Sequence, residues 1–441
     1  MRVGIIGAGA AGLAAAYELG KAGHQTVVYE RAPFLGGQAS TFDVGGSPLE
    51  RGYHHLFTSD TAILELIDDI GLGDRMSWFE SSVGILSDDG QIRSLVTPMD
   101  LLRFSPLSLV DRVRLGVVTM LLNWRKDWRG LEHLTADEWI RRWAGSGVYD
   151  TVWGPLLRGK FGEENFDKVG MPWFWGKIHT RFASRGKSMT KELLGYPMGS
   201  FGEVFDVLAD RVRELDGEVH LSAAVERVVV EDNAATGLEV TQGDDEALTE
   251  SFDAVLATTP SFIFPKLVPP MPDDYAEHLS GVTYMAAVLI ILELDRPLTD
   301  VYWLNVADRS IPFVGVIEHT NMIDRSLYGG KHIVYLSNYL SIDSPLYGMS
   351  HEELLAEYLP HLRKINPDFE DSWVQTSHHH KVGAAQPIIG THYSERIPDH
   401  RTPFERLYLA NTTQIYPEDR GTNYSVRMGR QVARMVLDDL G

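Results

Sequence analysis

The first thirty residues contain the feature that most constrains this chain. Residues 3–6 form a short apolar run typical of a buried parallel strand, and Gly-Ala-Gly-Ala-Ala-Gly follows directly at residues 7–12. A helical pattern runs from Ala11 to about Leu19, and a second apolar run, residues 26–29, ends at Glu30. Strand, glycine-rich turn, helix, strand and acid in this order predict a βαβ unit that binds a dinucleotide.

Each part of this unit has a physical role in binding. Gly7 permits a tight turn, Gly9 lets the backbone approach a pyrophosphate, and Gly12 lets helix and strand pack closely. The helix N-terminus offers free N–H groups to phosphates, and Glu30 is placed to accept hydrogen bonds from a ribose diol. A glycine-rich turn without a ligand is the alternative, but the strand, helix and acid at their expected spacing favour binding. We expect the dinucleotide to contact Gly7, Ala8, Gly9, Ala10, Ala11, Gly12, Tyr29, Glu30 and Arg31.

A paired-glycine motif follows the second strand. With Gly36, Gly37 and Gln38, the unit resembles the FAD-dependent amine oxidase, protoporphyrinogen oxidase and phytoene desaturase superfamily. The resemblance implies that the dinucleotide is FAD. Members of that superfamily usually have Arg after the two glycines, close to the pyrophosphate, whereas Gln38 can donate hydrogen bonds but brings no charge.

The resemblance covers nearly the whole chain. It implies that Gly52 passes the flavin ring, and Gly52-Tyr53-His54 also resembles UDP-galactopyranose mutase, which uses flavin without net redox. Tyr53 and His54 are therefore candidate catalytic residues, and packed or surface loop histidines are the alternative for His54 and His55. The resemblance places six further positions at the cofactor: Val225, Thr258, Asn411, Asn423, Tyr424 and Ser425.

Composition excludes several classes of function. The chain has 441 residues, no cysteine and a formal net charge of −21, so disulfides and thiol chemistry are excluded and nucleic acid is not an expected partner. Its apolar runs are too short to span a bilayer, and it begins directly with a strand that the fold needs, so we expect a cytoplasmic protein.

We expect an α/β fold in which a Rossmann-type FAD-binding domain is discontinuous and a mixed α+β substrate domain is inserted into it. The expected FAD-binding segments are residues 1–98, 199–283 and 386–441. Residues 99–198 are the helical part of the substrate domain, and residues 284–385 supply its strands and a capped helix.

One helix in the substrate part is unusually apolar. Leu109, Val113, Val117, Leu121 and Trp124 form one stripe, and Val110, Leu115, Val118 and Leu122 fill most of the rest. So broad an apolar surface favours burial in a domain core. Contact with the substrate or peripheral contact with a membrane is the alternative.

The expected function is oxidation of a bulky, largely apolar substrate by hydride transfer to flavin N5, with O2 or a quinone as the diffusible acceptor. Many amine oxidases have a Lys near flavin N5, and no Lys occurs between Lys266 and Lys331, which favours the protoporphyrinogen-oxidase-like branch. A flavin amine oxidase, a non-redox sugar-nucleotide mutase and a flavin-free binding protein of the Rab GDP-dissociation-inhibitor type are the alternatives. No metal site is expected, because three adjacent strand histidines, 378–380, cannot face one ion.

Overall fold

A parallel sheet carries the nucleotide-binding end of the molecule. In the computed structural model, which describes residues 1–185, 192–243, 246–269 and 271–441, this sheet has five strands in the order β10-β2-β1-β14-β20. The strands are β1 (Arg2–Ile6), β2 (Gln25–Glu30), β10 (Glu218–Leu221), β14 (Ala254–Ala257) and β20 (Leu407–Leu409). They come from three separate stretches of the chain, and each neighbouring pair is parallel.

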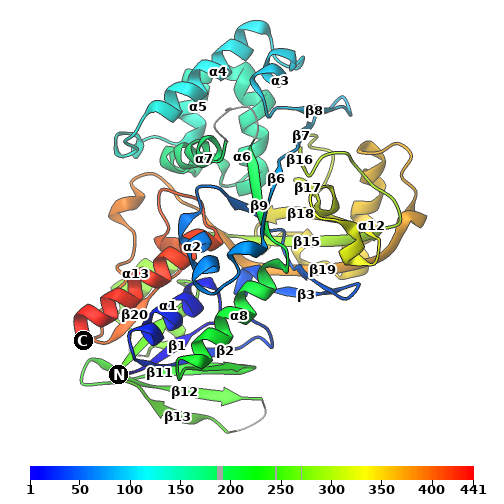
Figure 1. Cartoon of the computed structure of the whole chain (residues 1–441). Coiled ribbons are helices and arrows are strands. Elements are labelled where there is room, and N and C mark those ends of the chain that lie inside the picture. The colour runs from blue at the N-terminus through cyan, green and yellow to red at the C-terminus, as the bar shows by residue number, and fades with distance from the viewer. Residues whose placement is uncertain (186–191, 244–245, 270) are drawn as a thin grey trace.

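Both faces of this sheet are covered, which explains why its strands read as continuous apolar runs. Val3 and Ile5 pack with helices α1 (Ala10–Lys21), α8 (Ser200–Glu214) and α13 (Thr422–Leu440) on one face. Val27 and Val255 pack against an antiparallel sheet on the other face. That sheet consists of β11 (Ala223–Glu231), β12 (Ala234–Gln242) and β13 (Leu248–Ser251), and both chain ends lie near it in Figure 1.

A second, larger sheet forms the middle of the molecule (Figure 1). Its order is β19-β15-β18-β17-β16-β7-β8. The strands are β7 (Val83–Leu86), β8 (Ile92–Ser94), β15 (Tyr284–Leu294), β16 (Trp303–Val306), β17 (Gly315–Glu318), β18 (His332–Leu340) and β19 (Val374–Pro387). Strands β7 and β8 come from residues 1–98, which the sequence predicts to form an FAD-binding segment. Part of that segment therefore lies in this second sheet.

Strand β15 is buried on both sides because alternate residues face different cores. Leu289 and Ile291 point to the core shared with α1, while Val288 and Ile290 point to a core closed by α12 (His351–Tyr358). The smaller elements of this middle region are β3 (Thr41–Val44), β4 (Ser47–Glu50), β5 (Leu56–Phe57), β6 (Met76–Glu80), β9 (Leu193–Pro197), α2 (Thr61–Asp69) and α11 (Pro345–Gly348). Helices α9 (Phe264–Leu267) and α10 (Asp273–Ser280) belong instead to the core between the parallel sheet and β11–β13.

Helices make up the end of the molecule opposite the chain termini, at the top of Figure 1. They are α3 (Pro98–Arg103), α4 (Leu109–Trp124), α5 (Ala136–Val148), α6 (Gly154–Phe161) and α7 (Met171–Ala183). Helix α5 begins with the capping box that its sequence predicts, in which Thr135 and Glu138 bond each other's backbone N–H. Leu157 and Phe174 are among the buried side chains that hold the helices together.

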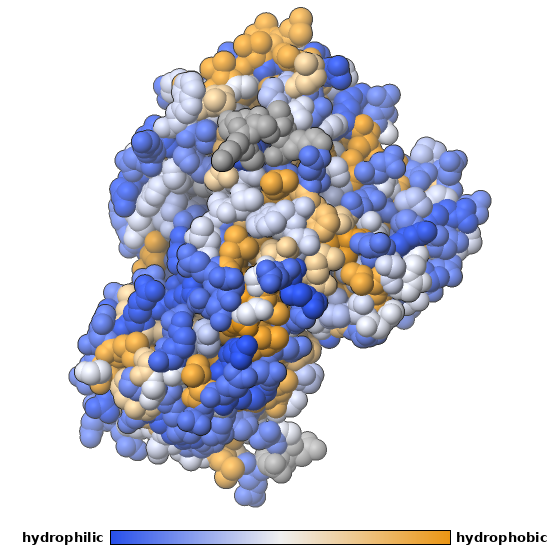
Figure 2. Space-filling view, viewed as in Figure 1, coloured by the Kyte–Doolittle hydropathy of each residue, from blue (hydrophilic) through white to orange (hydrophobic). Residues whose placement is uncertain are grey.

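The predicted burial of the α4 stripe is wrong. Leu109 is 71% exposed, Val113 61% and Trp124 67%, and Val117 and Leu121 are also exposed. The helix packs on α5 and α7 with its other side only, through Leu115, Val118 and Leu122. Figure 2 shows apolar side chains gathered at this end of the molecule. Among the described residues, no helix combines the length and apolar content that crossing a bilayer requires.

Candidate active site

The β1–α1 turn has the geometry that its glycines predict. Gly7 has a φ of +105°, and its N–H donates to Tyr29 O at 2.8 Å. A Cβ on Gly12 would lie 2.0 Å from Gly7 O, so only glycine fits the close approach of helix and turn. Gly9 precedes helix α1, and no side chain caps that helix. The N–H groups of its first turn are therefore available to a phosphate.

Glu30 lies at the end of β2, and its carboxylate points to the β1–α1 turn. Its Oε2 accepts from Ala8 N at 3.0 Å and its Oε1 from Ala32 N at 2.8 Å. A carboxylate has about four acceptor sites, so each oxygen keeps one for a ribose hydroxyl. The turn and Glu30 together fit the pyrophosphate and ribose of FAD.

The paired glycines bring a second loop against the first. Gly36 has a φ of +92° and donates to Ala8 O at 3.0 Å, and Gly37 also has a positive φ. The exposed Gln38 donates through Nε2 to Ala384 O at 2.9 Å. Its Oε1 accepts from Arg420 Nη1 at 3.4 Å. Thus Arg420, from the segment before α13, supplies a cation beside the position at which relatives have Arg.

The remaining sequence-predicted contacts are held by internal bonds. The Tyr29 hydroxyl donates to Glu250 at 2.6 Å, and Thr258 Oγ1 donates to Ile6 O at 2.8 Å behind the turn. Val225 lies at an irregularity of strand β11, and Arg31 is exposed. These positions surround the nucleotide half of the site, and their contacts with FAD stay predictions.

The C-terminal segment reaches the site where α13 begins. Asn411 is buried, and its side chain bonds Thr413 N, Ser261 and Thr259 O within the protein. Asn423 Oδ1 accepts from Ala62 N at 2.9 Å and therefore caps α2. The main-chain N–H and C=O of Asn411 are bonded to Gln414 as well, whereas Asn423 lines the cavity and the side chains of Tyr424 and Ser425 are half-buried at the start of α13.

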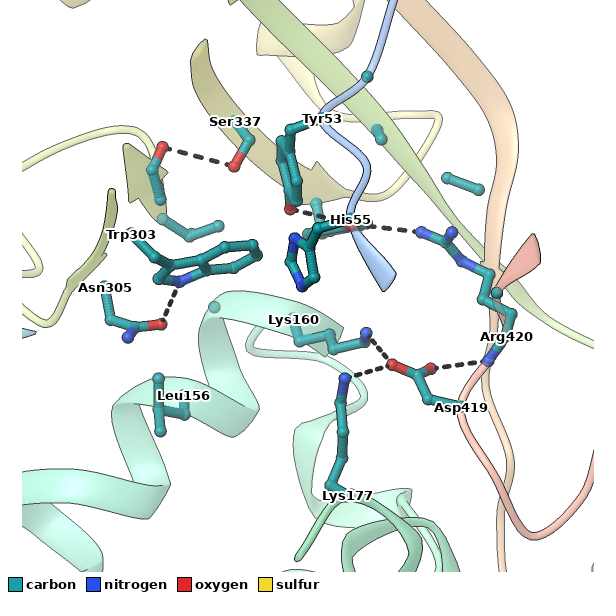
Figure 3. Close-up of a pocket in the computed structure, with 18 of the residues that line it drawn as sticks. Tyr53, His55, Leu156, Lys160, Lys177, Trp303, Asn305, Ser337, Asp419 and Arg420 are labelled. Atoms are coloured by element: carbon teal, nitrogen blue, oxygen red, sulfur yellow. Dashed lines mark hydrogen bonds and ion pairs between the residues drawn. The ribbon is translucent and has the colours of Figure 1, made fainter. Parts of the chain in front are cut away.

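A cavity of about 350 Å³ joins the cofactor loops to the middle sheet and the helices. Its lining includes Gln38, Gly52 and the first turn of α13 from the cofactor loops, together with Trp303, Leu156 and Trp153. Tyr53 projects into it (Figure 3), with its ring edge-on to Trp303 at 4.9 Å between centroids and its hydroxyl 3.4 Å from Tyr339 Oη. The structure thus brings the candidate Tyr53 to the junction of the two halves.

The candidate His54 and its neighbour His55 line this cavity as neutral rings. The ring of His54 donates from Nδ1 to Gly52 O at 2.6 Å, and that of His55 bonds the Tyr302 hydroxyl at 3.1 Å. Burial lowers the pKa of His54 to about 4 and that of His55 to about 3. At neutral pH both imidazoles are therefore uncharged, and they form these hydrogen bonds in the neutral form.

The sequence reasoning missed a charged cluster in the same cavity (Figure 3). Lys160 from α6 and Lys177 from α7 both contact Asp419 Oδ2, at 2.6 and 2.8 Å. Arg420 follows Asp419 and donates to Tyr339 Oη at 3.2 Å. No lysine occurs between Lys266 and Lys331, but Lys160 and Lys177 bring two ammonium groups into the cavity. The sequence feature that could have indicated this cluster is the run of three charged residues, 418–420, shortly before α13.

The chain was compared with known proteins. A model of the flavin-containing amine oxidoreductase family matches residues 10–437. The 15-cis-phytoene desaturase of Synechococcus elongatus is 24% identical over 398 residues, which is 83% of this chain and 80% of that protein.

Two solved structures have the same fold. An oxidoreductase from Methanosarcina mazei, 19% identical, has a TM-score of 0.75 and covers 99% of this chain and 100% of its own. A reduced UDP-galactopyranose mutase, 15% identical, has a TM-score of 0.76 and covers 99% of this chain and 95% of its own. The chain belongs to the flavin-containing amine oxidoreductase family, and its cofactor is FAD.

Proposed function

We propose that this protein oxidises a bulky, largely apolar organic molecule at carbon. The observation that carries the proposal is the cavity itself, because aromatic and aliphatic side chains such as Trp303 and Leu156 (Figure 3) line it together with residues of the cofactor loops. Bound FAD would supply the acceptor for a hydride from a substrate C–H or C–N carbon, with O2 or a quinone as the final acceptor.

The protein's own residues then orient the substrate and exclude water. Trp303 is held by a bond from Nε1 to Asn305 Oδ1 at 3.0 Å and by its edge contact with Tyr53. Leu156 and Trp153 extend the apolar wall from α6 and the turn before it. Fixed aromatic rings orient a large substrate without a conformational cost at the moment of reaction.

The test is anaerobic stopped-flow reduction of the bound flavin. We expect isoprenoid or tetrapyrrole candidates to bleach the flavin at 450 nm, which is roughly where oxidised flavins absorb, and small primary amines to leave it oxidised. Fast bleaching by amines or polyamines, with none by the apolar candidates, would establish an amine oxidase. Purified protein without flavin would favour the binding-protein alternative.

One observation favours a second candidate, a non-redox sugar-nucleotide mutase. Tyr53, Tyr339 and Arg420 lie together at the cofactor side of the cavity, with Lys160 nearby, and such a set could hold a diphosphate. Turnover of a nucleotide sugar only after prereduction of the flavin, without net consumption of reductant, would support this candidate over oxidation.

We also propose that the outward side of α4 contacts a membrane surface. Its exposed apolar side chains lie among basic ones: residues 98–130 contain six Lys or Arg and three Asp or Glu, in a chain whose formal net charge is −21. An apolar face flanked by cations is typical of a helix that lies in the interface of an anionic bilayer.

The measurement is co-sedimentation with vesicles of phosphatidylcholine and phosphatidylglycerol. Replacing Val113 and Val117 by Ser should reduce the bound fraction at least tenfold, because two apolar contacts are lost from the lipid-facing side. Leu248→Ser is the matched control, since Leu248 is 68% exposed on the distant strand β13. Equal binding by all three proteins would refute the membrane contact.

A further inference from the structure

We propose that the cavity contains an anion subsite formed by Lys160, Lys177 and Arg420, and that the substrate carries a carboxylate or phosphate beside its apolar part. The inference rests on the proposed function, because it names the class of molecule that the same cavity accepts. It adds an anionic group to the bulky, largely apolar substrate proposed above.

Asp419 cannot neutralise the two lysines that it contacts. Both ammonium groups bond the same oxygen, Oδ2, at 2.6 and 2.8 Å. The other oxygen, Oδ1, accepts from Trp173 Nε1 and from the backbone N–H of Arg420, each at 3.1 Å. All four acceptor sites of the carboxylate are therefore occupied, and its single negative charge is shared between two positive charges.

Arg420 adds a third positive charge without a carboxylate partner among the described residues. Its guanidinium contacts two neutral oxygens, Gln38 Oε1 at 3.4 Å and Tyr339 Oη at 3.2 Å. Its buried Nε has no hydrogen-bond partner within the described chain. A planar guanidinium with free donors matches the oxygens of a carboxylate or a phosphate.

The charges around the cavity confirm this excess. Four cations line it, Lys160, Lys177, Arg181 and Arg420, against the carboxylates of Asp60 and Asp419. Arg181 is separately paired with Glu192 at 3.4 Å. With Arg181 paired in this way, three cations face two carboxylates, and this excess of positive charge is costly to bury unless an anion joins it.

The pKa shifts of these side chains agree with a cluster that has too little negative charge. Burial lowers the pKa of Lys160 to about 8, and its contact with Asp419 does not restore the ordinary value. Burial opposes ionisation of Asp419, but Lys160, Lys177 and Arg420 hold the pKa of that carboxyl well below its usual range. Arg420 and Lys160 also outweigh burial at Tyr339 and lower the pKa of its phenol.

The cluster and the apolar wall occupy opposite sides of one cavity. In Figure 3, Trp303 and Leu156 lie on one side, and Lys160, Lys177 and Arg420 lie on the other. A ligand that satisfies both sides is an amphiphile with an anionic group at one position and hydrocarbon at another. The β1–α1 turn is the expected site for the diphosphate of FAD, and of the three cations Arg420 alone bonds Gln38 beside it.

The experiment measures binding of unreactive saturated probes to the oxidised FAD-containing protein. Undecanoate, decyl phosphate, 1-decanol and decyltrimethylammonium share a decyl tail and differ only in the head group. Binding is followed by perturbation of the flavin absorption spectrum. We expect at least one anion to bind tenfold or more tightly than the alcohol, and the cation to bind weakest. The two anionic probes distinguish a carboxylate substrate from a phosphate.

Variants locate the subsite. Lys177→Met and Arg420→Met should each reduce the preference for the anion over the alcohol at least fivefold, while Lys168→Met should not change it. Lys168 is the matched control because its ammonium bonds Asn165 on the same helical part of the chain, away from the cavity lining. Flavin content and decanol affinity show whether a variant is folded. If a variant does not fold, the comparison of the four probes on the unaltered protein still tests the subsite.

A rival role for the three cations is stabilisation of the negative charge on reduced flavin. That role predicts no preference for anionic probes in the oxidised protein, so equal affinities of anion and alcohol would overturn the subsite. Tighter binding of decyltrimethylammonium would overturn it as well. Because the probes are not oxidised, failure of flavin bleaching would reject the proposed reaction and leave the anion subsite standing.

Discussion

Replacing Glu30 by Ala should weaken FAD binding about a hundredfold. The carboxylate holds two backbone N–H groups, of Ala8 and Ala32, and each of its oxygens keeps a lone pair for one ribose hydroxyl. A hydrogen bond to a charged group contributes about 1.5–3 kcal/mol. Two such bonds at the lower end contribute about 3 kcal/mol, and 1.4 kcal/mol corresponds to a factor of about ten in Kd.

Gln38→Ala is the comparison that isolates the ribose assignment. Gln38 is exposed, and its side chain makes one neutral bond to Ala384 O and one long contact with Arg420. A neutral bond contributes about 0.5–1.5 kcal/mol, so this variant should lose tenfold or less in affinity.

The assay titrates each apoprotein with FAD and follows the quenching of flavin fluorescence. Urea unfolding of the apoproteins serves as the control, because Glu30→Ala also releases two loop N–H groups and should cost the apoprotein about 1 kcal/mol. Equal losses of FAD affinity in the two variants, measured where both apoproteins are folded, would refute the assignment of Glu30 to the ribose.

Three further predictions follow from buried contacts. Burial raises the pKa of Glu50 to about 7, so the folded protein keeps this proton where the unfolded chain loses it, and roughly 3 kcal/mol of stability should disappear as pH rises from about 4.5 to 7. Glu50→Gln should abolish that part of the pH dependence in urea unfolding, and parallel profiles of variant and parent would contradict it. Asn423→Ala should lower the free energy of unfolding by about 1–2 kcal/mol, because α2 loses its cap, and an unchanged value would show that water replaces the amide. Gly12→Ala should destabilise the protein by about 1–3 kcal/mol and abolish FAD retention, because the new Cβ would meet Gly7 O. Gly348→Ala, where nothing lies within 4 Å of the new Cβ, should behave as the unaltered protein does.

Local sequence determines the nucleotide-binding unit almost completely. The tight turn at Gly7, the close approach at Gly12 and the acid at the end of β2 depend on residues within thirty positions of one another. Backbone conformation, strand burial and helix capping are short-range properties, so a pattern of residue types is enough to predict them. The capping box of α5 depends in the same way on residues three positions apart, Thr135 and Glu138.

Only the tertiary structure decided which side of α4 is exposed. The helix is apolar almost all round, and its periodicity does not say how many neighbours pack on it. The answer depends on α5 and α7, which cover Leu115 and Leu122 and leave Val113 and Val117 uncovered. Residue type sets the cost of exposure, whereas packing of distant segments sets which side chains are exposed.

The charged cluster in the cavity is a tertiary property for the same reason. Lys160, Lys177 and Arg420 come from α6, α7 and the loop before α13, and nothing in their local sequence requires them to meet. Their unmatched charge exists only after folding places them around Asp419 in a shared cavity. Coulomb interactions act through space and strengthen as water is excluded, so the chemistry of the cavity follows from which residues the fold brings together.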